Sequence, residues 1–373
     1  MKRIITIATL CLLMAVYKAE AIDLSSWAHK STITFSGYGK TETLTNFPAL
    51  VQIGTNISGY SPSQSLCPVT NGCDLRFTLA DGTTELNYEK ELWSNSTLTN
   101  SIFWVQVPLL TNGTQIVAYW GKSTNSPAYT TNGATWGSSY VGVWHLADLT
   151  TSTIKDSTSN YLAGAKLGAN LPVETNGVIG KAQYFNGSSA AINIGENPIL
   201  SVTNMTIEVW VKAAATQTAW AGILGKHFGT GNDYMLQFNN LTGNILLYQQ
   251  SSISFDTGYQ LSVIAESWNY LVVTHNGSNV ISYRNGAQVI AGSLVPPTTT
   301  AGTLTIGQER TGIKFAGSLD EIRICNISQS SNWVWACYQN MASNGVFQGY
   351  GTATAQSSGN PAAMFQAIMS LLE

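Results

Sequence analysis

The stretch LRFTLADGTTELNY, residues 75–88, decides the fold class of this chain. Asp81-Gly82 separates two runs of alternating apolar and polar residues, a pattern typical of a β-hairpin. Both turn residues tolerate the positive φ of a type I′ turn, so position 79 should face 84, 77 should face 86 and 75 should face 88. Arg76, Glu85 and Glu89 then share the opposite face, where we expect Arg76 to form cross-strand ion pairs with the two glutamates.

Short strands on both sides of this hairpin extend the β pattern through residues 22–138. Candidate strands lie at residues 31–35, 47–53, 102–107 and 115–120. A polar, turn-rich stretch at residues 122–137 marks the end of this region. We therefore predict a first domain that is β-rich and sandwich-like.

A second β-rich series covers residues 139–350. No helical periodicity interrupts it, so the pattern predicts a β-sandwich. Its candidate strands are residues 142–146, 182–185, 191–194, 205–212, 221–226, 234–239, 244–249, 268–275, 280–284, 303–306 and 317–325. The fold class expected for the whole chain is all-β, with two domains.

The first 21 residues have the three parts of a secretory signal peptide. Lys2 and Arg3 precede an apolar run at residues 4–16, and Ala19 and Ala21 supply the small residues that a signal peptidase reads. The run is shorter than the ~20 residues that a membrane-spanning helix needs, which favours cleavage over a retained anchor. We expect an exported protein, secreted or at the cell surface, with no membrane span after cleavage.

The low charge of the chain argues against a nucleic-acid partner. Charged residues make up 10% of the sequence, and the net charge of −3 is dispersed without clusters of Lys or Arg. Binding to nucleic acid or to an anionic membrane would need such a cluster.

The cysteines favour local disulfides. Cys11 leaves with the signal peptide, and the four remaining cysteines can pair in three ways. Each close pair lies within one predicted domain, which favours the disulfides Cys67–Cys73 and Cys325–Cys337. Metal ligation is the alternative, but neither pair has the CxxC spacing typical of zinc sites. Disulfides agree with export to an oxidising compartment.

Residues 351–373 differ from both domains. They begin with a flexible linker composition, and Asn360-Pro361 then resembles the start of a helix. Apolar residues recur on one face of the short helix predicted there: Met364, Phe365, Ile368, Met369, Leu371 and Leu372. A helix this short is only marginally stable in isolation. It therefore either frays or docks on the surface of this protein, on a further segment of a longer chain, or on another subunit. The last of these would give self-assembly through the tail.

Ordered blocks of the first domain carry a family resemblance. They are NFPALV (46–51), CDLRFT (73–78), DGT (81–83), YEKELW (88–93), FWVQVP (103–108) and AYWG (118–121). Together they resemble a bacterial domain of unknown function that commonly precedes laminin-G-like domains in exported proteins. The resemblance brings no activity, but it implies a location in the bacterial periplasm or on the outer surface.

The second domain has matching blocks of its own. They are GVWHL (142–146), GKAQYFNG (180–187), MTIEVWVK (205–212), WNYLVVTH (268–275), YRNG (283–286) and GSLDEIRI (317–324). They resemble a laminin-G-like, concanavalin A-like jelly roll. The resemblance implies binding of glycans, matrix or other surface macromolecules, often with a structural calcium ion for which Asp320 and Asp156 are the candidate ligands. Calcium needs about six to eight oxygens, so backbone carbonyls would have to supply most of them.

Catalysis is not expected. Jelly-roll glycoside hydrolases often carry their carboxylates as Glu-x-Asp-x-x-Glu, and the nearest match has Glu89 and Glu91 but Ser94 in the last position. The four histidines lack metal-ligand spacing, and His145 and His275 follow apolar strands, where we expect satisfied sandwich residues. We therefore predict that the chain is not an enzyme.

Aromatic residues near turns are the candidate ligand contacts, because sugars stack on Trp and Tyr. Trp220, Tyr234 and Tyr248 lie in such segments, whereas Trp210 and Trp268 fall in predicted core strands. The function favoured by the sequence is glycan binding or adhesion without catalysis. The alternatives are a structural subunit of a surface layer or appendage and, less favoured, a polysaccharide hydrolase.

Overall fold

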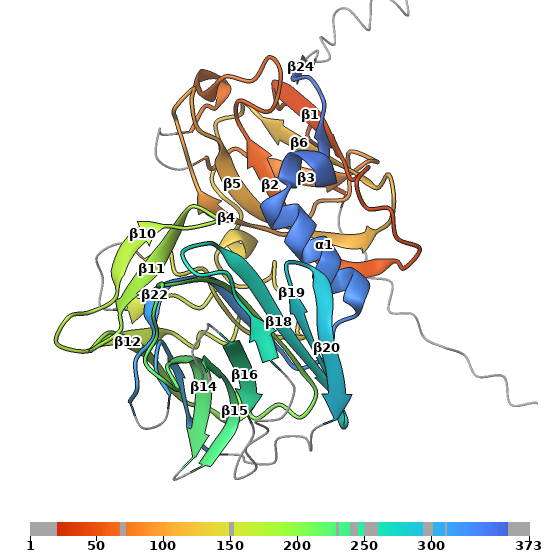
Figure 1. The fold of residues 1–373 in the computed structure, drawn as a ribbon. Helices are drawn as coiled ribbons and strands as arrows, with labels where there is room; N and C mark the ends of the chain where they lie inside the picture. The colour runs from red at the N-terminus through yellow and green to blue at the C-terminus, as the bar shows by residue number, and fades with distance from the viewer. Residues whose placement is uncertain are drawn as a thin grey trace, which may run out of the picture.

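The computed structural model contains two β-sandwiches with helix α1 (Ser331–Ala342) and the short helix α2 (Asn344–Phe347) beside them (Figure 1). It describes residues 21–67, 72–148, 153–228, 231–238, 245–249, 260–293, 301–309 and 312–356. The fold is mostly β, as predicted. Within these residues, no helix has the length and apolar character needed to cross a membrane.

The first domain contains two antiparallel sheets around one apolar core. One sheet contains β1 (His29–Thr34), β6 (Gln115–Trp120), β3 (Arg76–Leu79), β23 (Gly349–Tyr350) and β24 (Thr354–Ala355), and the other contains β2 (Leu44–Ile53), β5 (Ser101–Leu110) and β4 (Tyr88–Leu92). Ile33 and Phe77 of the first sheet and Phe47 and Phe103 of the second are fully buried in that core. Alternating residues of both sheets therefore face inward, as a sandwich requires.

The hairpin at residues 75–88 has the predicted register but divides between the two sheets. Backbone hydrogen bonds of 2.9 and 2.8 Å join Leu79 to Thr84 and Leu86 to Phe77. β3 then pairs with β6 and β4 pairs with β5, so the hairpin forms a corner of the sandwich. The turn is not type I′, because Gly82 alone of the two turn residues has a positive φ, of 72°. The preceding aspartate instead accepts hydrogen bonds from two following backbone N–H groups.

The chain returns to the first domain after completing the second. β23 and β24 pair with β1, through Ile33–Tyr350 and His29–Ala355 respectively. The expected linker from residue 351 is therefore part of this sheet as far as Gln356, because extended backbone at a sheet edge gains hydrogen bonds that composition does not reveal. The helix predicted within residues 360–373 lies outside the described residues.

Helix α1 lies where the sequence pattern predicts no helix. The Ser330 side chain caps its first turn by accepting a hydrogen bond from the Trp333 backbone N–H at 3.1 Å. Trp333, Val334, Cys337 and Met341 are all buried, with neighbours in both domains. A helix enclosed in this way lacks the polar stripe by which a surface helix is recognised in sequence.

Side-chain amides of the two helices and of Gln348, which follows α2, cover the free edge of β2. The backbone N–H of Leu50 donates to Asn340 Oδ1 at 2.6 Å. The carbonyl of Leu50 accepts hydrogen bonds from the amides of Asn344 and Gln348 at 2.7 and 2.8 Å. An open strand edge invites pairing with other chains, and these amides block that edge.

The second domain consists of two eight-stranded antiparallel sheets. One contains β7 (Tyr140–Trp144), β10 (Val173–Asn176), β11 (Lys181–Asn186), β13 (Met205–Ala213), β18 (Asn269–Asn276), β19 (Asn279–Arg284), β20 (Ala287–Ser293) and β22 (Ala316–Cys325). The other contains β8 (Thr153–Ile154), β9 (Gly164–Leu167), β12 (Ala191–Glu196), β14 (Gly222–Phe228), β15 (Gly231–Phe238), β16 (Ile245–Gln249), β17 (Gln260–Ser262) and β21 (Thr303–Ile306). Every candidate strand predicted in this region has a counterpart here.

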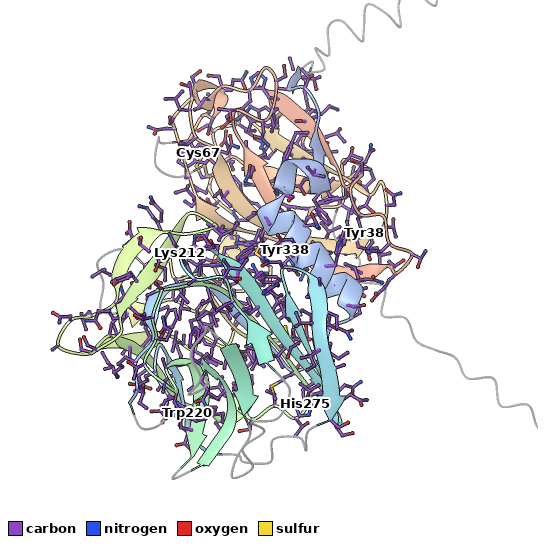
Figure 2. All side chains as sticks on the ribbon, viewed as in Figure 1. Tyr38, Cys67, Lys212, Trp220, His275 and Tyr338 are labelled. Atoms are coloured by element: carbon purple, nitrogen blue, oxygen red, sulfur yellow. A yellow bond between two sulfur atoms is a disulfide. The ribbon has the colours of Figure 1, made fainter. Side chains whose placement is uncertain are left out.

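The two domains share an apolar core along their contact region, which we call the seam. Trp210 and Tyr270, on β13 and β18, belong to the same buried cluster as Phe47 and Trp104 of the first domain. Tyr338 of α1, labelled in Figure 2, lies over them, with its ring centroid 5.8 Å from that of Trp210 and 6.2 Å from that of Tyr270. The seam is therefore a buried interface that α1 completes.

One of the two predicted disulfides is confirmed. Cys67 and Cys73 are bonded, whereas Cys325 and Cys337 are free and buried. The predicted Cys325–Cys337 bridge is wrong, because the two thiols fill space in the seam core from β22 and α1 as small apolar side chains. Burial raises the pKa of both thiols well above the ordinary value.

Loss of the Cys67–Cys73 disulfide should destabilise the protein moderately. The bridge closes a loop with a sequence separation of 6, which restricts the unfolded chain. Replacing both residues with Ser is expected to lower the free energy of unfolding by about 2 kcal/mol, the entropy cost of so short a loop. Urea denaturation of the two proteins without reductant measures the difference, and equal midpoints would contradict the expectation.

Candidate functional site at the seam

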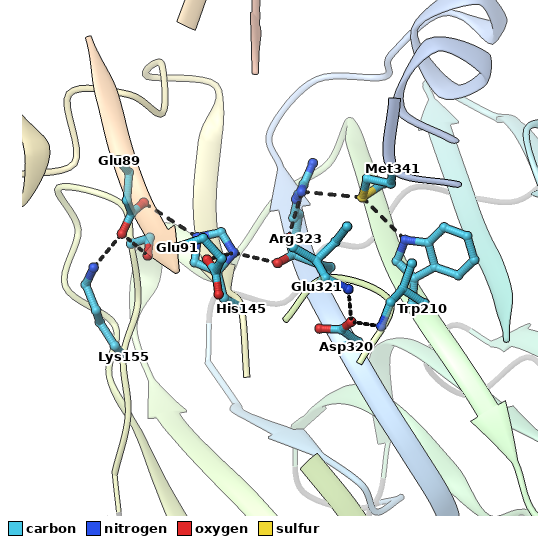
Figure 3. A network of polar contacts seen from close by, with 12 residues as sticks. Glu89, Glu91, His145, Lys155, Trp210, Asp320, Glu321, Arg323 and Met341 are labelled. Atoms are coloured by element: carbon cyan, nitrogen blue, oxygen red, sulfur yellow. Dashed lines mark hydrogen bonds and ion pairs between the residues drawn. The ribbon is translucent and has the colours of Figure 1, made fainter. Parts of the chain in front are cut away.

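Buried charge is concentrated at the seam, although only 10% of the residues are charged. β4 contributes Glu89 and Glu91 from the first domain (Figure 3). The second domain contributes His145, which follows β7, and Glu321 and Arg323 of β22. None of these five side chains is more than 9% exposed. We call them the seam cluster.

His145 lies at the centre of the seam cluster. Its Nδ1 is 2.7 Å from Glu321 Oε1 and 3.2 Å from Glu91 Oε2. Its Nε2 is 3.5 Å from Glu89 Oε2. Trp104 stacks on the imidazole with 5.9 Å between ring centroids and an interplanar angle of 11°. Carboxylates and an indole from both domains therefore fix the ring.

A β-bulge helps to aim Glu321 at the imidazole. The pairing of β22 with β13 shifts register between Glu208 and Trp210, and Glu321 has a φ of 50° at this point. A left-handed conformation of a non-glycine residue costs on the order of 1–3 kcal/mol, so the surrounding contacts must hold it. Such bulges re-aim side chains. Here Glu321 Oε2 also accepts a hydrogen bond from Arg323 Nη2 at 2.7 Å.

Arg323 is enclosed as completely as the carboxylates. Its guanidinium lies 4.3 Å from the ring centroid of Trp104 and 5.0 Å from that of Trp136. A second buried carboxylate, Glu208, lies 3.7 Å from Arg323 Nη1 and accepts a hydrogen bond from Tyr270 at 2.7 Å. The single cation therefore compensates two carboxylates in an apolar surrounding.

Glu89 connects the cluster to the loop after β8. It accepts hydrogen bonds from Trp136 Nε1 and from the Ser157 hydroxyl, each at 2.8 Å, and forms an ion pair with Lys155. Lys155 is 54% exposed on its side chain, so this edge of the cluster reaches the solvent.

The pKa values of Glu89 and Glu91 differ because the two side chains have different surroundings. Burial is the main reason that the pKa of Glu91 is raised to about 7, and the charges of Glu321 and Glu89 add to it while His145 opposes it. Burial would raise the pKa of Glu89 as well, but His145 and Lys155 outweigh burial and lower that pKa to about 2. Burial alone would lower the pKa of His145, whereas the carboxylates of Glu321 and Glu91 hold it well above its ordinary value. The carboxylates of Glu321 and Glu91 therefore favour the protonated form of the His145 imidazole.

Two cavities open along the seam. One of about 180 Å³ borders the seam cluster and is lined by Glu89, Glu91, His145, Asp148, Lys155 and Ser157, among others. The other, of about 330 Å³, lies between the start of β2, the segment before β7 and the segment before α1. We call this larger cavity the groove.

The groove is lined mainly by polar side chains. Thr43, Asn46 and Ser138 contribute exposed hydroxyl and amide groups, and Tyr140 and Trp333 contribute buried aromatic rings. The hydroxyl of Tyr140 is buried and has no hydrogen-bond partner among the residues that the structure describes. A polar ligand in the groove has donors, acceptors and aromatic surface to contact.

Residues 186–334 match the family model of the concanavalin A-like lectin/glucanases superfamily. The second domain is a laminin-G-like domain of that superfamily. No curated protein matches the chain.

Solved structures resemble the chain only in part. Domain 4 of AbnA, a GH43 extracellular arabinanase from Geobacillus stearothermophilus in complex with arabinotriose, has 20% identity and a TM-score of 0.44, covering 54% of this chain and 98% of that chain. The binding domain of botulinum neurotoxin serotype D/C has 10% identity and a TM-score of 0.42, with 54% and 52% covered. A Trypanosoma rangeli sialidase mutant displaying trans-sialidase activity has 12% identity and a TM-score of 0.41, with 63% and 42% covered. This chain thus spans about half or less of the length of the last two structures. None of the three similarities is strong enough to assign a function.

Asp156 of the laminin-G-like domain is surrounded by hydrogen-bond donors. Its Oδ1 accepts from the backbone N–H groups of Val143 and Thr158 at 3.0 and 2.9 Å. Its Oδ2 accepts from the Thr158 hydroxyl and from the Leu162 N–H at 2.9 and 2.8 Å. These donors occupy the lone pairs that a calcium ion would need, so Asp156 does not fit the predicted role of calcium ligand.

Asp320 does not fit that role either. It is fully buried, and its Oδ2 accepts hydrogen bonds from the backbone N–H groups of Val178 and Ile179 at 2.7 and 3.0 Å. Burial, and then repulsion by Glu321, raises the pKa of Asp320 well above its ordinary value. Two N–H donors therefore occupy Oδ2, and the raised pKa favours the neutral carboxyl, whereas calcium needs several oxygen ligands around it.

Of the three aromatic residues expected to contact a ligand, Trp220 is the one described as partly exposed. It has a φ of 68° in the turn before β14. Tyr234 is fully buried between the sheets, and its hydroxyl donates to the Leu200 carbonyl at 3.1 Å. The expectation for Tyr234 is wrong, because its position on β15 faces the core. The side chain of Tyr248 lies outside the described residues.

Glu89 does not face the partner that the hairpin register predicts, and His145 has more charged neighbours than expected. Arg76 pairs with Glu85 at 3.4 Å as expected, but Glu89 faces the seam instead of Arg76. His145 is buried as expected, yet three carboxylates surround it. The signal was the occurrence of Glu, Asp and Arg inside otherwise apolar strands, because buried charges need partners.

Proposed function

We propose that this chain is an exported, non-catalytic protein that binds glycans in the groove beside its laminin-G-like domain. The observation that carries the proposal is the lining of the groove, where hydroxyl and amide side chains accompany Tyr140 and Trp333. Sugars offer apolar ring faces for stacking and hydroxyl groups for directional hydrogen bonds, and this lining supplies both kinds of contact.

The size of the groove supports a small part of a glycan as the occupant. Its volume of about 330 Å³ lies at the lower end of the ~300–1,000 Å³ typical of ligand sites. The exposed side chains of Thr43, Asn46 and Ser138 give such a ligand hydrogen-bond partners at the groove surface.

The position of α1 restricts where a ligand can reach the laminin-G-like domain. The aromatic face of β13 and β18, with Trp210 and Tyr270, is covered by Tyr338 of that helix. Among the described residues, the groove and the turn that carries Trp220 are candidate sites that α1 leaves open.

Export and the absence of catalysis are parts of the same proposal. Export is supported by the signal-peptide pattern of residues 1–21 and agrees with the Cys67–Cys73 disulfide. A non-catalytic role is supported by the contacts of Glu89 and Glu321, whose oxygens already accept hydrogen bonds from Trp136 and Arg323. Turnover of a polysaccharide that is lost in Glu91→Gln would overturn that part and favour a hydrolase.

Glycan binding should depend on the amide of Asn46. This residue has a φ of 54°, so Asn46→Gly keeps the backbone conformation and removes only the side chain. On a glycan array, the unmodified protein is expected to bind a defined set of glycans, and Asn46→Gly should weaken that binding about tenfold through the loss of one or two hydrogen bonds. Ser278→Ala, at the exposed β18–β19 turn, is the matched control and should bind normally.

Two results would count against this proposal. A protein that retains no glycan from the array contradicts glycan binding itself. Binding that survives Asn46→Gly but is lost in Trp220→Ala contradicts the groove and moves the site to the turn before β14.

A further inference from the structure

We propose that the seam cluster binds one divalent transition-metal ion of the zinc class through Glu91, His145 and Glu321. One possible ligand atom from each of these three residues lies within 4.8 Å of the other two. The ligands come from β4 of the first domain and from two segments of the second, so the ion would link the domains. This inference is independent of glycan binding.

The spacing of the donor atoms suits a small ion. Zinc binds His nitrogen and carboxylate oxygen at ~2.0–2.2 Å, so tetrahedral ligands lie about 3.3 Å from one another. His145 Nδ1 is 3.2 Å from the Glu91 oxygen and 2.7 Å from the Glu321 oxygen. Two of the three donor separations are therefore close to those of a zinc site, and all three lie within 4.8 Å.

Glu89 holds the imidazole in the orientation that such an ion needs. A metal on Nδ1 leaves the ring proton on Nε2, and metal-bound histidines usually donate that proton to a carboxylate. His145 Nε2 is buried and has no hydrogen bond to any described residue, but it lies 3.5 Å from Glu89 Oε2. The contact of Nε2 with Glu89 leaves Nδ1, which faces the oxygens of Glu91 and Glu321, as the nitrogen available to the ion.

The charges around the ring also favour a cation. Glu89, Glu91, Glu208 and Glu321 are buried carboxylates, and Arg323 and Lys155 are the cations paired with them. With all four carboxylates ionised and a neutral imidazole, two negative charges stay uncompensated. One divalent ion neutralises them, whereas the metal-free cluster must retain protons.

The smaller cavity gives an ion a route to the cluster. Glu91 and His145 both line this cavity of about 180 Å³, together with Asp148 and Lys155. Water in it can complete the coordination sphere. Calcium is disfavoured, because it takes about six to eight oxygens and rarely a histidine nitrogen.

The test is metal binding by the full chain after treatment with a chelator. Isothermal titration with Zn²⁺ is expected to show one ion per chain, and Co²⁺ should give the visible absorption bands of a tetrahedral site. Glu91→Gln should abolish uptake, and Glu89→Gln should weaken it by about 10–100-fold as the partner of Nε2. His29→Asn, which alters a histidine that stacks on Trp120 outside the seam, is the matched control and should bind normally.

Zn²⁺ should also raise the melting temperature of the unmodified protein but not that of Glu91→Gln. Near-ultraviolet circular dichroism of each variant in chelator shows whether it is folded, so that loss of binding is not loss of structure. Absence of Zn²⁺ uptake by the unmodified protein would overturn the proposal. Uptake that persists in Glu91→Gln and in Glu321→Gln would overturn it as well, because the ion would then lie elsewhere.

Discussion

Replacing Arg323 with Met is expected to lower the free energy of unfolding by about 3–5 kcal/mol, the usual cost of removing one partner from a buried ion pair. The substitution keeps an apolar stem between Trp104 and Trp136 and removes only the guanidinium. Glu321 and Glu208 would then stay buried without their common cation. Urea denaturation measures the loss.

The surface pair Lys181–Glu174 provides the matched control. Its atoms are 2.9 Å apart, but its side chains are 43% and 20% exposed. Lys181→Met should therefore cost no more than about 1 kcal/mol. Adding Glu321→Gln to Arg323→Met should restore part of the lost stability, since it removes one uncompensated charge. An Arg323→Met protein as stable as the Lys181→Met protein would contradict this account of the seam.

Ending the chain at Ser343 is expected to prevent the first domain from folding. The deletion removes Phe347, which is 1% exposed and whose loss alone costs about 3–5 kcal/mol. It also removes Asn344 and Gln348 from the Leu50 carbonyl, and with them β23 and β24. Together, the stability lost with Phe347, the two amides and the two strands is a large part of the ~5–15 kcal/mol by which a typical domain is stable. Near-ultraviolet circular dichroism and limited proteolysis report the outcome.

A chain that ends at Gln356 is the control for this deletion. It keeps every described contact of the first sheet with residues 344–356, so its first domain should fold. Normal folding of the chain ending at Ser343 would show that β23 and β24 are dispensable. Concentration-dependent oligomers of the full chain that disappear in the chain ending at Gln356 would support the alternative of assembly through the tail.

Local patterns predicted much of the fold. The Asp-Gly turn predicted the pairing of Leu79 with Thr84, and apolar runs predicted the strands of both domains. The sequence did not reveal β23 and β24, because each has only two residues and depends on β1 for its hydrogen bonds. Helix α1 was hidden for another reason, since both domains bury it.

The candidate site was harder to predict than the fold. Arg76 and Glu85 face each other across one hairpin, and their ion pair followed from the register. The neighbours of His145 come from residues far apart in the chain, and only the docking of two domains brings them together. For Glu89, the alternation of the strand predicts the face on which the side chain lies, but it does not predict which domain packs against that face. Spacing within one segment carries no information about such contacts.

The pairing of β1 with β24 determines how the molecule carries mechanical force. The chain enters β1 near His29 and leaves β24 near Ala355, and these two residues are partners at the same end of the sheet. Tension between those points separates the two strands one hydrogen bond at a time, as in unzipping. The laminin-G-like domain lies outside this load path until β24, β23 and α2 have been pulled away. A domain inserted in this way keeps its shape while the ends of its host are under moderate tension.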